Sequence, residues 1–185
     1  MEFFGGARAN LGKHIQLNLH AGFVTIKNQP LFYNDTLTDE KAFIVMHEPT
    51  MNNLRLHADA SFVLQEQFTV TAAATLNIYN GHKIQERAWG LNPFEATGSL
   101  RWWAFKRLLL KADLWMFAGS PVLLKNNQNK NLAGGFDLSA GLEYRINDRF
   151  SAWMDLNNLL NNQYSRWNRY QVVGFNLLGG VLVRF

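Results

Sequence analysis

The chain has 185 residues, enough for one domain, and 48% of them are hydrophobic while 17% are charged. It contains no cysteine, which excludes disulfides, thiolate metal sites and cysteine nucleophiles. The net charge is +4, but Lys and Arg are scattered singly among acidic residues, so no basic stripe indicates a nucleic-acid partner. No stretch reaches the roughly 18 uninterrupted apolar residues of a membrane-spanning helix, which excludes a helical membrane protein.

Short segments of alternating hydrophobicity predict nine β-strands and an all-β, antiparallel fold. The strands follow one another as four hairpins and a final single strand. In chain order, we expect hairpins over residues 3–23, 54–78, 94–116 and 136–157, and the last strand over 173–185. The first hairpin is the least regular, because glycine and alanine occupy many of its positions.

The clearest alternation runs from Phe136 to Ile146. Every second residue is apolar, and the residues between them are Asp137, Ser139, Gly141, Glu143 and Arg145. Successive side chains of a strand point to opposite faces of the sheet. The pattern therefore predicts a sheet with one apolar and one polar face.

The connections between the predicted strands alternate between short and long. Turns near 11–13, 65–67, 106–107 and 147–149 are short, whereas the connections near 27–52, 80–92, 118–134 and 160–172 are long and polar. This asymmetry is typical of transmembrane barrels, which have short periplasmic turns and long extracellular loops. Residues 42–48 are apolar enough to extend the following strand above the membrane, and we expect Pro49 to interrupt its ladder.

The charged side chains indicate which face meets lipid. A charge on the lipid face costs about 2–4 kcal/mol at mid-depth, so the charged face must be luminal if the barrel lies in a membrane. The polar residues predicted to face the lumen are Arg55, His57, Asp59, Lys111, Asp113, Asp137, Glu143, Arg145 and Asp155. The alternative is a soluble lipocalin-like barrel, in which the apolar face points inward onto a ligand.

The strand count predicts a partial barrel. Single-chain bacterial barrels have an even number of strands, so nine strands indicate that further strands are missing upstream. The N-terminus lacks a basic region followed by an apolar one, and no plug domain is visible. We expect residues 1–185 to be one partial outer-membrane β-barrel domain without plug or signal peptide.

The C-terminal third resembles a known family. Residues 150–164 read FSAWMDLNNLLNNQY, Arg166-Trp167 follow, and residues 173–185 read VGFNLLGGVLVRF. These segments resemble the end of a TonB-dependent outer-membrane receptor, especially those of Bacteroidota. Residues 27–35, KNQPLFYND, are similar to a loop common in such barrels.

The resemblance implies the last nine strands of a 22-stranded barrel, preceded by a plug that contacts TonB. It implies nutrient uptake, of a siderophore, cofactor or glycan, across the outer membrane of a Gram-negative bacterium, in contact with lipopolysaccharide. It also implies a β-signal read by the barrel assembly machinery, carried by Leu177, Val181, Val183 and Phe185. The alternative within membrane proteins is a small self-contained barrel with a structural or adhesive role.

Catalytic and metal sites find little support in the sequence. His57, Asp59 and Ser61 share one strand face, but same-face neighbours lie about 6.5–7 Å apart along a strand. That distance is too long for a direct hydrogen bond between a nucleophile and its base, so we expect that the protein is not an enzyme. The remaining histidines show no paired ligand spacing, so we expect no metal site and no cofactor. Aromatic and basic residues of the long loops could instead contact a ligand or anchor the barrel against lipopolysaccharide: Arg87, Trp89, Arg166, Trp167, Arg169 and Tyr170.

Overall fold

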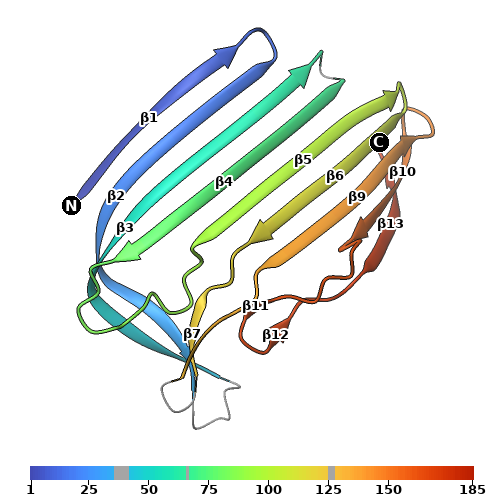
Figure 1. The fold of residues 1–185 in the computed structure, drawn as a ribbon. Coiled ribbons are helices and arrows are strands. Elements are labelled where there is room, and N and C mark those ends of the chain that lie inside the picture. The colour runs from blue at the N-terminus through green and yellow to red at the C-terminus, as the bar shows by residue number, and fades with distance from the viewer. Residues whose placement is uncertain (36–41, 66, 125–127) are drawn as a thin grey trace.

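A computed structural model describes residues 1–35, 42–65, 67–124 and 128–185. The main element is a nine-stranded antiparallel sheet in the order β1-β2-β3-β4-β5-β6-β9-β10-β13 (Figure 1). Its strands are β1 (Glu2–Leu11), β2 (Ile15–Asn34), β3 (Phe43–Leu64), β4 (Phe68–Asn80), β5 (Phe94–Phe105), β6 (Leu108–Phe117), β9 (Gly135–Arg145), β10 (Phe150–Asn157) and β13 (Asn176–Val183). Two small hairpins complete the described strands: β7 (Pro121–Leu123) with β8 (Asn129–Asn131), and β11 (Ser165–Trp167) with β12 (Tyr170–Gln171).

The nine predicted strands and the all-β class are confirmed, and the register explains why alternation predicted them. Apolar residues lie opposite apolar residues from strand to strand, as in the row formed by Ala72, Gly98 and Leu114. The short turns have the residues that tight reversals need. Gly12 has a φ of 68° between β1 and β2, and Asn147 accepts hydrogen bonds from the backbone N–H groups of Arg149 and Phe150, both at 2.9 Å.

The sheet is curved and open (Figure 1). Among the described residues, β1 pairs only with β2 and β13 pairs only with β10, so these two strands form free edges. Within the same residues, no helix has the length and apolar character needed to cross a membrane. The sheet is therefore an arc whose two edge strands still have unused backbone hydrogen-bonding groups.

The first long connection differs from the expectation. Most of residues 27–52 are strand, because β2 and β3 stay paired from Lys27 opposite Thr50 to Asn34 opposite Phe43. Pro49 interrupts the ladder, as expected, but only locally: pairing is absent at Pro49 and its opposite residue Asn28, and it resumes between Gln29 and Glu48. A proline removes one backbone donor, and Asn28 accommodates the irregularity with a φ of 53°. As predicted, the apolar residues after 42 extend β3.

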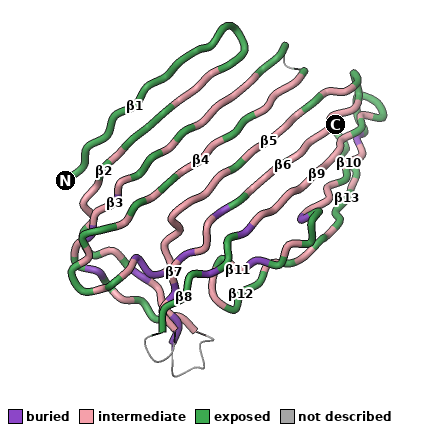
Figure 2. Tube along the Cα trace, in the orientation of Figure 1, coloured by how far each residue is buried: buried purple, intermediate pink, exposed green. Residues whose placement is uncertain are grey.

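The buried core lies at one end of the sheet rather than along it (Figure 2). We call this end the loop cap: the β2–β3 extension beyond β4 (29–34 and 43–50) with the described residues of 81–93, 118–134 and 158–175. The buried apolar side chains of the described residues lie in the cap or where the strands enter it: Leu31, Met51, Ala88, Trp89, Phe117, Val122, Leu132 and Tyr164. The long loops are therefore packed together, whereas no described element packs over either face of the sheet.

Candidate functional site

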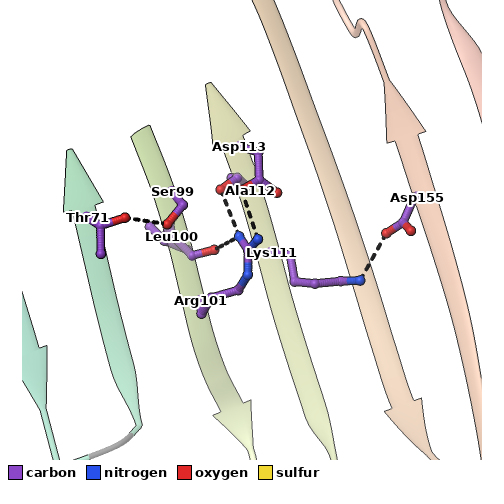
Figure 3. A network of polar contacts seen from close by, with 8 residues as sticks. All are labelled: Thr71, Ser99, Leu100, Arg101, Lys111, Ala112, Asp113 and Asp155. Atoms are coloured by element: carbon purple, nitrogen blue, oxygen red, sulfur yellow. Dashed lines mark hydrogen bonds and ion pairs between the residues drawn. The ribbon is translucent and has the colours of Figure 1, made fainter. Parts of the chain in front are cut away.

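The polar face of the sheet carries ion pairs that run between strands (Figure 3). Arg101 on β5 contacts Asp113 on β6, with Nη2 and Oδ1 2.8 Å apart, and its Nη1 donates to the backbone oxygen of Leu100 at 2.8 Å. The hydroxyls of Thr71 and Ser99 lie 2.6 Å apart in the neighbouring row. Arg101 lies directly opposite Lys111, and Asp113 lies directly opposite Ser99, so the Arg101–Asp113 pair is diagonal. The long arginine side chain reaches such a diagonal neighbour on the adjacent strand.

A glycine in β9 lets one ion pair span three strands. Lys111 on β6 reaches Asp155 on β10 past Gly141, with Nζ and Oδ1 3.1 Å apart (Figure 3). A Cβ added to Gly141 would collide with the Asp155 carboxylate and would lie 3.2 Å from Cε of Lys111. The missing side chain therefore provides the space in which the two charges meet.

Three more of the predicted luminal residues have partners outside their own strand. Glu143 lies 3.7 Å from the guanidinium of Arg184, just beyond β13, and the Arg145 guanidinium lies 4.4 Å from the centre of the Trp103 ring. Asp137 accepts a hydrogen bond from the Tyr164 hydroxyl at 3.0 Å. That these residues lie on one face agrees with the alternation, but their partners could not be read from the spacing within each strand.

Aromatic side chains join the polar face to the loop cap. Trp115, Phe117 and Tyr164 form a cluster with ring centres 4.8 to 5.6 Å apart. The Trp115 indole donates to Glu95 at 2.6 Å. Burial, followed by the hydrogen bond to Asp137 and the charge of that carboxylate, raises the pKa of Tyr164 to about 12. The Tyr164 phenol therefore stays protonated and keeps donating at neutral pH.

A buried carboxylate anchors the loop between β4 and β5. Glu48 is 0% exposed and accepts hydrogen bonds from the backbone N–H groups of Lys83 at 2.7 Å, Ile84 at 3.2 Å and Gln85 at 2.8 Å. The loop covers the Glu48 side chain completely. Burial acts to raise the pKa of Glu48, yet the backbone donors outweigh it and hold this pKa below its ordinary value.

The predicted loop contacts lie mainly within the cap. Trp167 packs against Phe32 and Phe43, with ring centres 5.7 Å apart in both pairs, and Tyr170 stacks on Phe43 at 5.6 Å. Trp89 is 2% exposed, and its indole donates to Gln85. Trp167 and Tyr170 hold segments from opposite ends of the chain together. A role in ligand contact stays a prediction for all three aromatic residues.

The predicted basic contacts lie nearer the surface. Arg87 donates from Nη1 to Asn131 at 3.1 Å, and the Arg166 guanidinium lies 5.4 Å from the centre of the Trp115 ring. Arg169 adopts a φ of 67° in the turn between β11 and β12. The predicted β-signal lies on β13 and just beyond it. Leu177, Val181 and Val183 are 57%, 64% and 42% exposed, and Phe185 is fully exposed.

A cluster that the sequence did not reveal lies on β2, β3 and β4. His57 is hydrogen-bonded through Nδ1 to the Thr75 hydroxyl at 2.8 Å, and its Nε2 lies 3.5 Å from Oδ1 of Asp59. His20 lies directly opposite His57, with ring centres 6.1 Å apart. The two histidines lie on different strands and far apart in the sequence, so only the register of β2 and β3 could have paired them. No hydrogen bond of Ser61 accompanies them among the described contacts.

The sheet has a hollow on each face near this cluster. On the polar face, Glu2, Phe4, His20, Arg55 and His57 line a cavity of about 320 Å³. On the apolar face, small residues leave a hollow of about 570 Å³ that is lined almost entirely by carbon. The two hollows therefore offer different chemistry on the two sides of the same strands.

Comparison with known proteins gives matches of structure but not of sequence. No protein-family model matches the chain, and no curated protein matches it. The copper transporter OprC covers all of this chain at 15% identity with a TM-score of 0.74. The FrpB iron transporter from Neisseria meningitidis does so at 17% identity and 0.73, and the pyoverdine outer-membrane receptor FpvA from Pseudomonas aeruginosa at 14% and 0.76.

At these identities the likeness shows the fold. The chain spans only 31%, 30% and 29% of the three chains. By their names, two of the matched proteins are transporters, of copper and of iron, and the third is an outer-membrane receptor.

Proposed function

We propose that this chain is the C-terminal barrel segment of a TonB-dependent outer-membrane receptor. The proposal starts from the sheet, which has the fold of part of such a barrel. It lies in the outer membrane of a Gram-negative bacterium and contributes to uptake of a nutrient of the siderophore, cofactor or glycan class. A plug outside residues 1–185 closes the lumen and contacts TonB. Further strands complete the barrel along the edges of β1 and β13.

The observation that carries this proposal is the exposed apolar face of the sheet. Large apolar side chains stand exposed along this face from one edge to the other, in a pattern that soluble monomers rarely show. Examples from successive strands are Leu19 at 57%, Leu56 at 40%, Leu76 at 38%, Trp102 at 42%, Met116 at 37%, Tyr144 at 47%, Met154 at 36% and Val181 at 64%. Contact with the hydrocarbon chains of lipid would remove this apolar face from water.

The opposite face supports the same orientation. Its ion pairs, such as Arg101 with Asp113 and Lys111 with Asp155, are partly exposed and bridge neighbouring strands. A water-filled or plug-filled lumen accommodates these charges, whereas hydrocarbon would penalise each of them by about 2–4 kcal/mol at mid-depth. The loop cap then lies at the extracellular end, where Arg87 and Arg166 are placed to meet a ligand or lipopolysaccharide.

The two alternatives are less well supported. A soluble lipocalin-like barrel needs the apolar face inside a packed interior, but those side chains are exposed and the buried core lies in the cap. A small self-contained barrel needs β1 and β13 to meet, and they are unpaired with each other in the described residues. Both strands also run in the same direction in this odd-numbered sheet, so their closure would be parallel.

Cysteine labelling tests the orientation directly, because the chain has no native cysteine. In the full chain placed in lipid vesicles, Leu56→Cys and His57→Cys put the thiol on the two faces of one strand. We expect a membrane-impermeant maleimide to label His57→Cys, and a bilayer-dissolved maleimide to prefer Leu56→Cys. Equal labelling of the two variants by the impermeant reagent would contradict the proposed orientation of the sheet in the membrane.

Uptake is tested in the host. Deletion of the gene should abolish uptake of one labelled nutrient from a panel of siderophores, cofactors and glycans, and expression of the complete reading frame should restore it. Unchanged uptake of the whole panel, together with correct membrane insertion, would favour the structural or adhesive barrel.

A further inference from the structure

We propose that His20, His57 and Asp59 form a binding site for one divalent transition-metal ion, such as Cu²⁺, Ni²⁺ or Zn²⁺, on the polar face of the sheet. The site is separate from the choice of nutrient in the proposed function. It follows from the juxtaposition of the three side chains on β2 and β3. Imidazole nitrogens and carboxylate oxygens are ligands that these ions accept.

The strand register brings the two imidazoles within range of one ion. His20 lies directly opposite His57 on the same face, and the ring centres are 6.1 Å apart. A metal-bound imidazole places its ring centre about 3 Å from the ion, so two rings on one ion have centres about 5 to 6 Å apart. The observed separation of 6.1 Å is just above that range, so a small movement of one ring would let both bind one ion.

The spacing between His57 and Asp59 also fits a shared ion. Nε2 of His57 and Oδ1 of Asp59 are 3.5 Å apart, longer than the 2.7–3.2 Å of a good hydrogen bond. Two ligand atoms about 2.0–2.2 Å from one tetrahedral ion lie roughly 3.3–3.5 Å from each other. The gap between these atoms therefore matches an ion between them better than direct contact.

Neighbouring side chains hold both ligands in a metal-binding state. The Thr75 hydroxyl lies 2.8 Å from Nδ1 of His57 and can accept its proton, which leaves the lone pair of Nε2 free. Asn18 donates from Nδ2 to Oδ2 of Asp59 at 2.6 Å, which leaves Oδ1 on the side of His57. Such partners of ligand residues fix their orientation and raise metal affinity.

His20 is the ligand that must move. No group of three or more His, Cys, Asp or Glu side chains in the described residues is yet arranged to hold a metal ion. Nδ1 of His20 lies over Gly6 on β1, which has no side chain to restrict the ring. Rotation of a half-exposed side chain takes place readily, so a bound ion can draw His20 toward His57.

The surroundings admit a hydrated cation. His20 and His57 line the cavity of about 320 Å³ on the polar face, which leaves room for water ligands. Arg55 lines the same cavity and repels a cation, but the carboxylates of Glu2 in its wall and Asp59 beside His57 outnumber it. The charge around the site therefore favours cation binding.

The test is Cu²⁺ binding to the full chain folded in detergent micelles. Electron paramagnetic resonance of the unmodified protein should show two equatorial imidazole nitrogens on one bound Cu²⁺, and calorimetry should give one site. Thr75→Val should weaken binding by about 10- to 100-fold, because it removes the partner of Nδ1. His20→Ala and His57→Ala should each weaken it more. His14→Ala and His82→Ala, which remove histidines elsewhere in the chain, should leave it unchanged.

A spectrum with one or no nitrogen ligand would overturn the proposal, as would equal losses in His14→Ala and His20→Ala. The spectrum of the unmodified chain is decisive even where a variant fails to fold. Failure of this site would leave the receptor function standing, because labelling of the two faces and nutrient uptake are measured separately.

Discussion

Individual side chains attach the loops to the sheet and link the strands across its polar face. Glu48 is the clearest case, since one carboxylate satisfies three consecutive backbone donors of the loop after β4. Gly141 acts through the side chain it lacks, because its position gives Lys111 access to Asp155. Both roles depend on the tertiary neighbour and can be tested by single substitutions.

Acidification should release the loop that Glu48 holds. The folded pKa of Glu48 is below its ordinary value of 4.5, so its stabilisation is fully present above that pH and is lost as the pH falls through the folded pKa. Hydrogen exchange of the amides of residues 83–85, corrected for the intrinsic rate, should therefore accelerate in acid more than that of strand amides.

Glu48→Gln should produce the same release at neutral pH. The amide keeps one acceptor oxygen and presents a donor to the backbone N–H groups, which costs about 1–3 kcal/mol locally. The matched control is Glu86→Gln, which changes an exposed acid of the same loop. Protection of residues 83–85 that is the same in both variants would contradict the anchoring role.

Gly141→Ala should destabilise the sheet by about 1–3 kcal/mol, because the new methyl group pushes apart the pair that meets there. Gly98→Ala is the control, since a Cβ at Gly98 finds its nearest neighbour, Cβ of Leu114, at an ordinary 3.6 Å. Urea unfolding in lipid vesicles measures both. Equal midpoints for the two variants would show that Lys111 and Asp155 adjust without cost.

At the scale of elements, the β2–β3 extension and the β11–β12 hairpin form the cap across the end of the sheet. They are far apart in the chain, yet Trp167 packs on Phe32 and Phe43, and Asn168 donates to Asn34 at 3.2 Å. The strands continue beyond β4 because β2 and β3 remain paired with each other there. The cap is therefore an arrangement of elements rather than a set of independent loops.

Trp167→Ala should detach the hairpin from the extension. Two aromatic contacts are lost, at about 0.5–1.5 kcal/mol each beyond the area they bury. Limited proteolysis should then cut within residues 165–171 faster than in the unmodified chain. Trp102→Ala removes an exposed tryptophan on the apolar face and serves as the control. Unchanged cleavage in Trp167→Ala would show that other contacts hold the hairpin.

At the scale of the whole molecule, the open arc makes assembly dependent on its edges. β13 ends the sheet with an exposed apolar face, and its backbone groups on one side are unpaired in the described part of the chain. The predicted β-signal lies on this same strand. An edge strand with free hydrogen-bonding groups is suited to recognition by strand addition.

Phe185→Ala should therefore lower the amount of assembled protein in the outer membrane. Phe175→Ala, which removes an exposed phenylalanine just before β13, is the control. Heat-modifiable migration and the amount in the membrane fraction report assembly. Levels that fall equally in both variants would indicate general loss of hydrophobicity rather than recognition of the final residue.

The sequence alone determined the strands and their two faces, because alternation with period two is a local property. It predicted the β9–β10 hairpin within a residue or so, and it placed Lys111, Asp113 and Glu143 on one face. It also predicted that the apolar residues after 42 extend β3. The continuation of β2 through residues 27–34 was not predicted, because it is stabilised by pairing with β3 and its own sequence there begins with polar residues.

Only the tertiary structure decided which residues meet. Ion partners, the aromatic contacts of the cap and the pairing of His20 with His57 depend on register, and each joins residues far apart in the chain. The physical reason is that alternation specifies the face of a side chain but carries no information on its neighbour in the next strand. That neighbour is set by turn length and by the fit of whole strands.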